Sequence, residues 1–155
     1  MMSKKRKYTA GTWFAVPLRS NGYAFGVVSH VGKGGIVFGY FFGPKANELP
    51  VNLPFDFKPE MKILCGRFGD NGIVNGEWPI LEDTPDWNSE IWPMPPMVRV
   101  DEKEGIAFIA YYDEKTVELI SEERCDPVLV ESHPYDRLMG YGSVEISLTK
   151  LLTST

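Results

Sequence analysis

The chain is poor in the residues that carry most metal and redox chemistry, with two cysteines and two histidines among its 155 residues. A small secreted domain held by disulfides would contain more cysteines, and Cys65 and Cys125 fit no CxxC spacing. We therefore expect both to be buried, apolar-like side chains. His30 and His133 lie far apart without ligand spacing, so the sequence predicts no metal site and no cofactor.

The chain also lacks long apolar runs and a surplus of basic residues. No stretch approaches the roughly 18 apolar residues of a membrane span, and the basic run at residues 4–7 precedes no apolar segment of a secretory signal. The formal net charge of −5 argues against binding to a bare nucleic acid backbone. We expect a cytoplasmic protein that binds neither nucleic acid nor membrane, folded as a single domain over 1–155 with a flexible basic tail at 1–8.

Catalytic motifs are missing as well. No GxSxG elbow is present, and GKGG at 32–35 lacks the rest of a phosphate loop, so a hairpin turn is the better interpretation. Cys125, His133 and Asp136 could in principle form a nucleophile, base and orienting group, but neighbourhood in sequence does not place them together in space. The sequence predicts that the chain is not an enzyme. An enzyme with a pocket that depends on the fold stays a third alternative.

Short apolar runs that alternate with a period of two predict a mainly β fold. Residues 13–18 place Phe14, Val16 and Leu18 on one face of a strand. The Asn-Gly signal at 21–22 predicts a hairpin between this strand and the next, at 22–28. Further strands are predicted at 35–43, 62–68, 77–81, 97–100, 105–112 and 116–120.

One helix is predicted, at the C-terminal end. Val144, Leu148, Leu151 and Leu152 fall at i, i+4, i+7 and i+8, and Ser143 could cap the helix. The expected fold is mainly β, at the margin of α+β. It is a twisted antiparallel sheet or a small open barrel with one C-terminal helix, packed by Val144, Leu148 and Leu151. Exposed strand edges would allow two copies to pair as a homodimer.

Charge is distributed unevenly along the chain. Residues 1–72 hold ten Lys/Arg and four Asp/Glu, a net charge of +6, whereas residues 73–155 hold six Lys/Arg and seventeen Asp/Glu, a net charge of −11. Such an acidic half is a candidate surface for a basic partner, whose association it would accelerate. Solubility alone is the alternative explanation.

The segment at 82–96 is the longest without a regular pattern, and long loops on a β scaffold often carry function. Trp78, Trp87 and Trp92 fall within fifteen residues beside several prolines. They could form a stacking platform or an interface hot spot, or they could cover a sheet face. We expect Trp78 and Trp92, each followed by Pro, to be cover, and Trp87 to be the exposed one.

Several motifs follow one another over residues 8–150: GTWFAVPL at 11–18, GYAFGVV at 22–28, GEWP at 76–79, EIWPMPPMVRVD at 90–101 and GYGSVEI at 140–146. In this order they resemble the immunity protein 26 family of bacterial polymorphic toxin systems. The resemblance implies a cytoplasmic antidote without catalytic activity that binds a cognate toxin. The matching residues are predicted to be scaffold and not contact residues: Gly11, Phe14, Pro17, Gly26, Trp78 and Trp92.

We therefore expect an immunity protein that occludes a basic toxin domain, such as a nuclease. The predicted contact residues are Glu82, Asp83, Asp86, Trp87 and Glu90. In this scheme Trp87 is the apolar anchor, and the carboxylates steer the encounter and fix its register. The alternative is a small β-rich binding module that holds a carbohydrate or peptide through the aromatic, Pro-rich loop.

Overall fold

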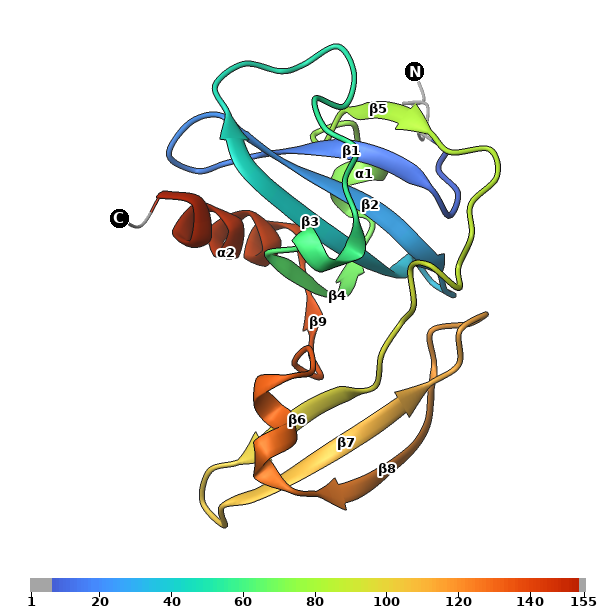
Figure 1. The fold of residues 1–155 in the computed structure, drawn as a ribbon, viewed down its shortest axis with the longest axis vertical. Helices are drawn as coiled ribbons and strands as arrows, with labels where there is room; N and C mark the ends of the chain where they lie inside the picture. Colours follow the sequence, from blue (N-terminus) through green and yellow to red (C-terminus); the bar gives the residue numbers. More distant parts are fainter. Residues whose placement is uncertain (1–6, 154–155) are drawn as a thin grey trace.

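The computed structural model describes residues 7–153, which form two open sheets and one long helix (Figure 1). The larger sheet has the order β5-β1-β2-β3-β4-β9 and the smaller one the order β6-β7-β8. The strands are β1 (Thr12–Pro17), β2 (Tyr23–Val31), β3 (Ile36–Ala46), β4 (Leu64–Gly69), β5 (Ile80–Asp83), β6 (Met97–Asp101), β7 (Ile106–Tyr112), β8 (Leu119–Cys125) and β9 (Leu138–Met139). The helices are α1 (Asn71–Val74) and α2 (Tyr141–Thr153), with 3-10 turns η1 (Pro59–Met61) and η2 (Pro127–Glu131).

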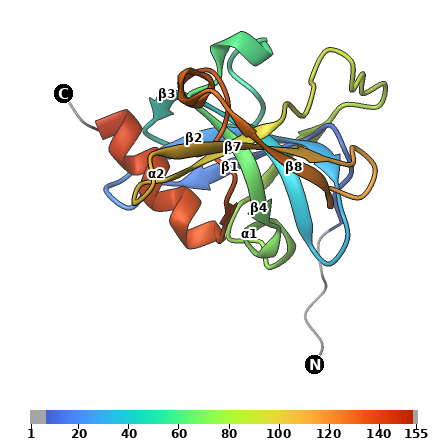
Figure 2. The same ribbon diagram turned by 90° about the horizontal axis from the view of Figure 1, so that it is seen from below.

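The predicted fold class, mainly β, is confirmed. Of the two predicted architectures, the structure has open sheets and not a barrel, because neither sheet closes. Seen from below, the strands of the smaller sheet cross in front of those of the larger one (Figure 2). β9 was not predicted, since it has two residues. It pairs with β4 in parallel, so the larger sheet is not wholly antiparallel. The predicted tail at 1–8 falls mostly on residues 1–6, outside the described part of the chain.

The predicted hairpin between the first two strands is confirmed. β1 and β2 pair antiparallel up to Pro17 opposite Tyr23, and Gly22 takes a φ of +83° in the turn, where glycine is favoured. Pro17 is the last residue of β1 and lies beyond the stretch that pairs with β5, so its missing N–H breaks no ladder there. The turn at 32–35 joins β2 to β3, as expected for a hairpin.

The larger sheet buries a separate apolar cluster on each face. The first cluster lies beneath α2 and contains Phe14, Val16 and Leu18, which confirms the predicted face of β1. The second cluster lies on the opposite face and contains Trp13, Phe25 and other aromatic side chains. Alternation along β1 and β2 thus assigns successive side chains to different cores, which explains why both strands are almost entirely buried.

Helix α2 covers the first cluster, but two details of its prediction were wrong. The helix begins at Tyr141, so Ser143 lies inside the first turn and is not its cap. Leu151 is 50% exposed, whereas Leu152 packs against the first cluster. Glu145 is also buried, and the buried side of the helix therefore includes Leu152 and not Leu151.

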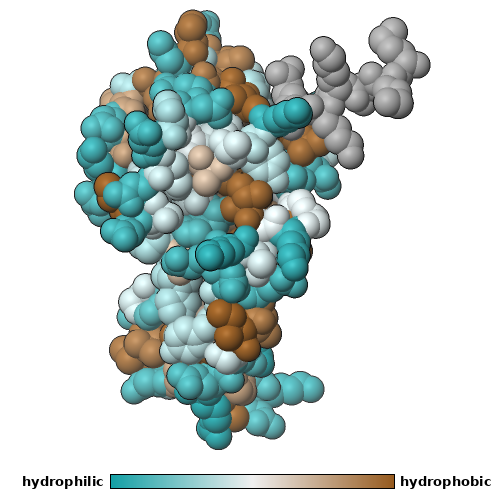
Figure 3. Space-filling model, turned by 90° about the vertical axis from the view of Figure 1, so that its right-hand side faces the viewer, coloured by the Kyte–Doolittle hydropathy of each residue, from teal (hydrophilic) through white to brown (hydrophobic). Residues whose placement is uncertain are grey.

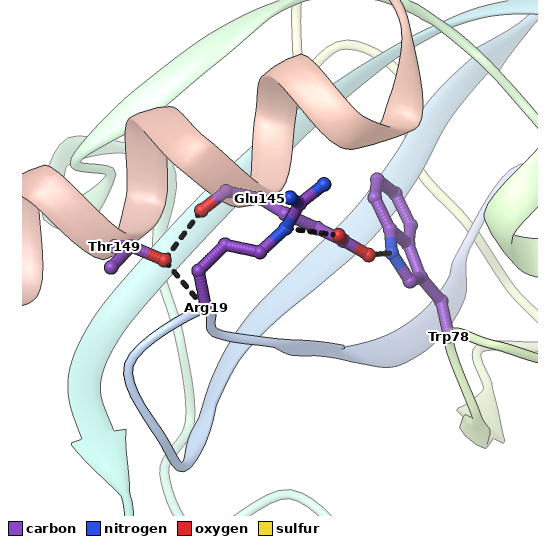
Figure 4. A network of polar contacts seen from close by, with 4 residues as sticks. All are labelled: Arg19, Trp78, Glu145 and Thr149. Atoms are coloured by element: carbon purple, nitrogen blue, oxygen red, sulfur yellow. Dashed lines mark hydrogen bonds and ion pairs between the residues drawn. The ribbon is translucent and has the colours of Figure 1, made fainter.

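Glu145 fixes α2 to the sheet through a polar network (Figure 4). Its carboxylate accepts a hydrogen bond from Nε1 of Trp78 at 2.9 Å and forms an ion pair with Arg19, whose Nε lies at 2.9 Å. One turn later, Oγ1 of Thr149 accepts the backbone N–H of Arg19 at 2.9 Å and donates to the carbonyl of Glu145. The network joins α2, the β1–β2 turn and Trp78, which lies two residues before β5, and the carboxylate accepts the one hydrogen bond that the buried indole donates.

Two strands, β5 and β8, begin three residues later than predicted. β5 starts at Ile80, since the N–H of Trp78 first bonds to the carbonyl of Gly72 and closes the turn after α1. β8 starts at Leu119, since residues 113–118 form a turn in which the carboxylate of Asp113 accepts two backbone N–H groups. Neither turn has a signature in the apolar pattern from which the strands were predicted.

Besides Met97 at the start of β6, which is buried in the second cluster, contacts at two further places attach the smaller sheet to the larger one. Val117, in the turn before β8, is buried in the second cluster. Arg67 on β4 pairs with Asp136 at 3.2 Å and lies over the ring of Tyr112 on β7, at 4.5 Å from its centroid. The hydroxyl of Tyr112 also donates to Asp136. These contacts at two separate points fix the orientation of the smaller sheet.

Candidate partner-binding surface

The loop between β5 and β6, residues 84–96, lies over the second cluster. Trp92 is 7% exposed and meets the rings of Trp13 and Tyr40 edge-on, at 5.7 and 5.2 Å between centroids. The hydroxyl of Tyr40 donates to the carbonyl of Pro93. Trp78 is fully buried in the first cluster. The prediction that Trp78 and Trp92 cover sheet faces is confirmed.

Trp87 is the least buried of the three, but it does not project freely into solvent. Its Nε1 donates to the carbonyl of Ser29 at 3.1 Å, and its ring stacks on Trp92 at 5.1 Å between centroids. The ring also lies against Gly11, where an added Cβ would come within 3.1 Å of it. Trp87 therefore fixes the loop to β2 and leaves part of its indole accessible.

A hollow of about 330 Å³ opens between this loop and a second loop at 53–58. Aromatic rings form much of its wall, from Trp13, Phe55, Phe57, Trp87 and Trp92. Three carboxylates and one ammonium group also line it: Glu82 and Asp86, and Asp56 paired with Lys58 at 2.9 Å. Phe55 and Ile91 are 48% and 57% exposed at its border. The arrangement offers exposed apolar groups together with negative charge.

The structure brings three of the five predicted contact residues, Glu82, Asp86 and Trp87, to this hollow. Glu82 also accepts the backbone N–H of Leu53 at 3.2 Å and so ties the second loop to β5. Asp83 points elsewhere, since its carboxylate accepts the hydroxyl of Thr12.

The fifth predicted residue, Glu90, lines a neighbouring cleft of about 920 Å³. Ile91 lines both the hollow and the cleft, so the two form a continuous surface. The far wall of the cleft comes from η1, β4 and residues 131–137. We call the hollow, Glu90 and Ile91 together the acidic aromatic surface.

Sequence reasoning missed the second loop, 53–58, which supplies Phe55, Asp56 and Phe57. Their alternation with prolines gives no regular pattern, and only the fold brings them opposite Trp87. Phe57 packs on Trp13 and Phe42 at 5.8 and 4.7 Å between centroids, so the loop is held by the second cluster. The aromatic content of this short segment was the one available signal.

Cys65 in the cleft is not an activated nucleophile. Burial raises the pKa of the Cys65 thiol to about 11, so this side chain is protonated at neutral pH. Both cysteines are partly exposed and unpaired, so the expectation of full burial was wrong. The possible catalytic set of Cys125, His133 and Asp136 does not assemble, because His133 hydrogen-bonds to Ser132 and Leu129, and Asp136 to Arg67 and Tyr112. Within residues 7–153, no three His, Cys, Asp or Glu side chains gather as a metal site.

Comparison with known families gives one match. Residues 9–106 match the family model described as Immunity protein 26, which amounts to 98 of the 155 residues. The matched segment includes β1 to β6 and both loops of the acidic aromatic surface, whereas β8 and α2 lie outside it. No curated protein and no solved structure matches the chain significantly. Among the described residues, no helix has the length and apolarity needed to cross a membrane.

Proposed function

The chain belongs to the immunity protein 26 family, and on this premise we propose that it neutralises a cognate bacterial toxin by binding and occluding it. It acts in the cytoplasm and catalyses no reaction. The observation that carries the proposal further is the acidic aromatic surface, which lies within the segment that matches the family. The partner that this surface fits is a basic toxin domain.

The chemistry of the surface suits a Lys- or Arg-rich partner. A cationic side chain that enters the hollow would meet the carboxylates of Asp86 and Glu82 and the edges and faces of aromatic rings. Phe55 and Ile91 would supply apolar contacts next to it. A standard interface covers about 800 Å² on each partner, so strand edges and loops around the hollow would contribute as well.

The five predicted residues take different parts in this proposal. Asp86 and Glu90 are exposed and steer the approach of a basic partner. Glu82 and Asp83 hold the two loops and β5 in place through Leu53 and Thr12, and Trp87 fixes the loop to β2. A preformed surface of this kind loses less entropy on binding than a flexible loop would.

The experiment removes charge without changing side-chain shape. The double variant Asp86→Asn with Glu90→Gln should slow association with the toxin domain encoded beside this chain by about threefold or more at low salt, and should weaken its salt dependence. Stopped-flow fluorescence measures both. The control Glu102→Gln with Glu104→Gln makes the same charge change in the β6–β7 turn. Equal rates for the two double variants would contradict the proposed contact surface.

The second candidate function is a module that binds a carbohydrate or peptide, which the aromatic wall of the hollow favours. Trp87 and Trp92 stack on each other, so neither offers both of its faces to a sugar ring. Titration with oligosaccharides, followed by tryptophan fluorescence, separates the two functions. Saturable quenching would support the carbohydrate module, and its absence together with tight toxin binding would support the immunity function.

A further inference from the structure

Strand β8 forms an open edge of the smaller sheet. Within the described residues it pairs with β7 on one side and with no strand on the other. Six of its seven residues are exposed, including Leu119 at 56% and Ile120 at 65%. Unpaired backbone N–H and C=O groups along such an edge can form a ladder with another chain.

The smaller sheet also carries most of the chain's acidic excess. Residues 97–131 hold ten Asp/Glu and four Lys/Arg, a net charge of −6, and these ten are more than half of the seventeen acids in residues 73–155. Along the edge, Glu122 pairs with Arg99 at 2.8 Å, and Glu123 accepts the hydroxyl of Tyr111 at 3.2 Å. Because the hydroxyl of Tyr111 is neutral, it does not compensate the negative charge of Glu123. The one cation on the strand, Arg124, is adjacent to Glu123, so the acidity comes from the net charge of −6 over residues 97–131, which favours a basic strand over a neutral or acidic one.

Resting on the proposed function, we propose that β8 binds an extended, basic segment of the toxin, which joins the smaller sheet as a fourth strand. The backbone ladder supplies the attachment, and the side chains of β8 select the partner. Lys or Arg opposite Glu123 and an apolar residue opposite Ile120 are the complementary choices.

A second copy of this chain fits the same edge less well. A second copy would bring the same net charge of −6 over residues 97–131 to this edge, so the two smaller sheets would repel each other. The charge therefore favours a basic segment of another protein over self-pairing.

The location of β8 agrees with a contact that continues from the acidic aromatic surface. Strand β8 and the loop at 84–96 both lie on the right-hand side of the molecule in Figure 1. Seen from that side, the molecule has two lobes joined by a narrower waist, with apolar side chains set among polar ones on both lobes (Figure 3). Val117, in the turn before β8, is buried in the second cluster, so the edge is held in a fixed orientation.

The test compares two variants that make the same change at two exposed isoleucines. Ile120→Lys places a positive charge on the β8 edge, and Ile146→Lys places one on the outer face of α2, where Ile146 is 44% exposed. Binding of each full-length variant to the cognate toxin domain is measured by calorimetry. Hydrogen exchange of the amides of β8 is measured with and without that domain.

We expect Ile120→Lys to weaken binding about tenfold or more, Ile146→Lys to change it less than about twofold, and the β8 amides to become protected in the complex. Equal affinities for both variants, with unprotected β8 amides, would overturn the β8 contact while leaving the proposed function intact. A wild-type chain that does not bind the toxin would overturn both. A dimer of the free chain that Ile120→Lys dissociates would show that a second copy occupies the edge, which also overturns the inference.

Discussion

Replacing Glu145 by alanine should destabilise the protein by removing the buried carboxylate that joins α2 to the larger sheet. The substitution removes the carboxylate that accepts the indole N–H of Trp78 and the ion pair of Arg19. Trp78 is fully buried, so its N–H would lose its partner without gaining water. The side chain of Arg19 is 54% exposed and can turn into solvent instead.

The magnitude follows from these two exposures. An orphaned buried donor costs about 1–3 kcal/mol, and a surface-accessible ion pair contributes about 0–1 kcal/mol. With the apolar part of the buried side chain also lost, the free energy of unfolding should fall by about 3 kcal/mol. For a chain of this length, that corresponds to a decrease in Tm of about 6–12 °C.

Urea unfolding followed by tryptophan fluorescence and far-ultraviolet circular dichroism measures this change. Glu145→Gln should cost about 1 kcal/mol, since its amide oxygen can still accept the indole N–H. Ile146→Ala removes an exposed side chain from the same helix and controls for effects on the helix itself. If Glu145→Ala cost no more than Glu145→Gln, the bond to Trp78 would not be what stabilises this helix.

Two further predictions concern the sheet. Gly26→Ala would place a Cβ 2.5 Å from Cε1 of Phe14, so overpacking should lower the free energy of unfolding in urea by about 1–3 kcal/mol. Gly69→Ala is the control and should cost much less, because nothing lies within 4 Å of the added Cβ. Similar losses for both variants would contradict the close packing of Gly26 on Phe14. Burial lowers the pKa of His30 below its usual 6.5, so the unfolded chain binds a proton more readily and stability should fall as the pH decreases through and below 6.5. Urea midpoints at pH 7.5 and 5.5 should differ less in His30→Gln than in the wild type, and an equal difference would exclude His30 as the cause.

The sequence was sufficient to predict the features that depend on local pattern. The β1–β2 hairpin could be predicted because alternation assigns Phe14 and Phe25 to opposite faces and Asn21-Gly22 marks the turn. Glu145 could not be predicted as buried, because its partner Trp78 is 67 residues away in the sequence. A charged residue in an apolar stripe looks the same whether it faces solvent or a buried indole.

Part of the candidate site could likewise be predicted from the sequence, and part could not. The loop with Trp87 could be identified from composition, since tryptophans, prolines and acids gather there. Its opposite wall could not, because Phe55 and Phe57 reach the hollow only through packing on the rings of the second cluster. The acidity of the smaller sheet was visible as a charge imbalance, but its location on an open edge required the strand order.

The path of the chain has a consequence for how its specificity can change. The chain leaves the larger sheet after β5, builds β6, β7, β8 and η2, and returns to the larger sheet at β9. The smaller sheet is therefore an excursion between two segments of one scaffold, and the family match ends at residue 106, near its start. Such an excursion can diverge in sequence, or be exchanged between relatives as a unit, provided that Met97 and Val117 keep their places in the second cluster. Under the proposed function, a change confined to this excursion would alter the proposed β8 contact and leave the larger sheet and the loop at 53–58 as they are.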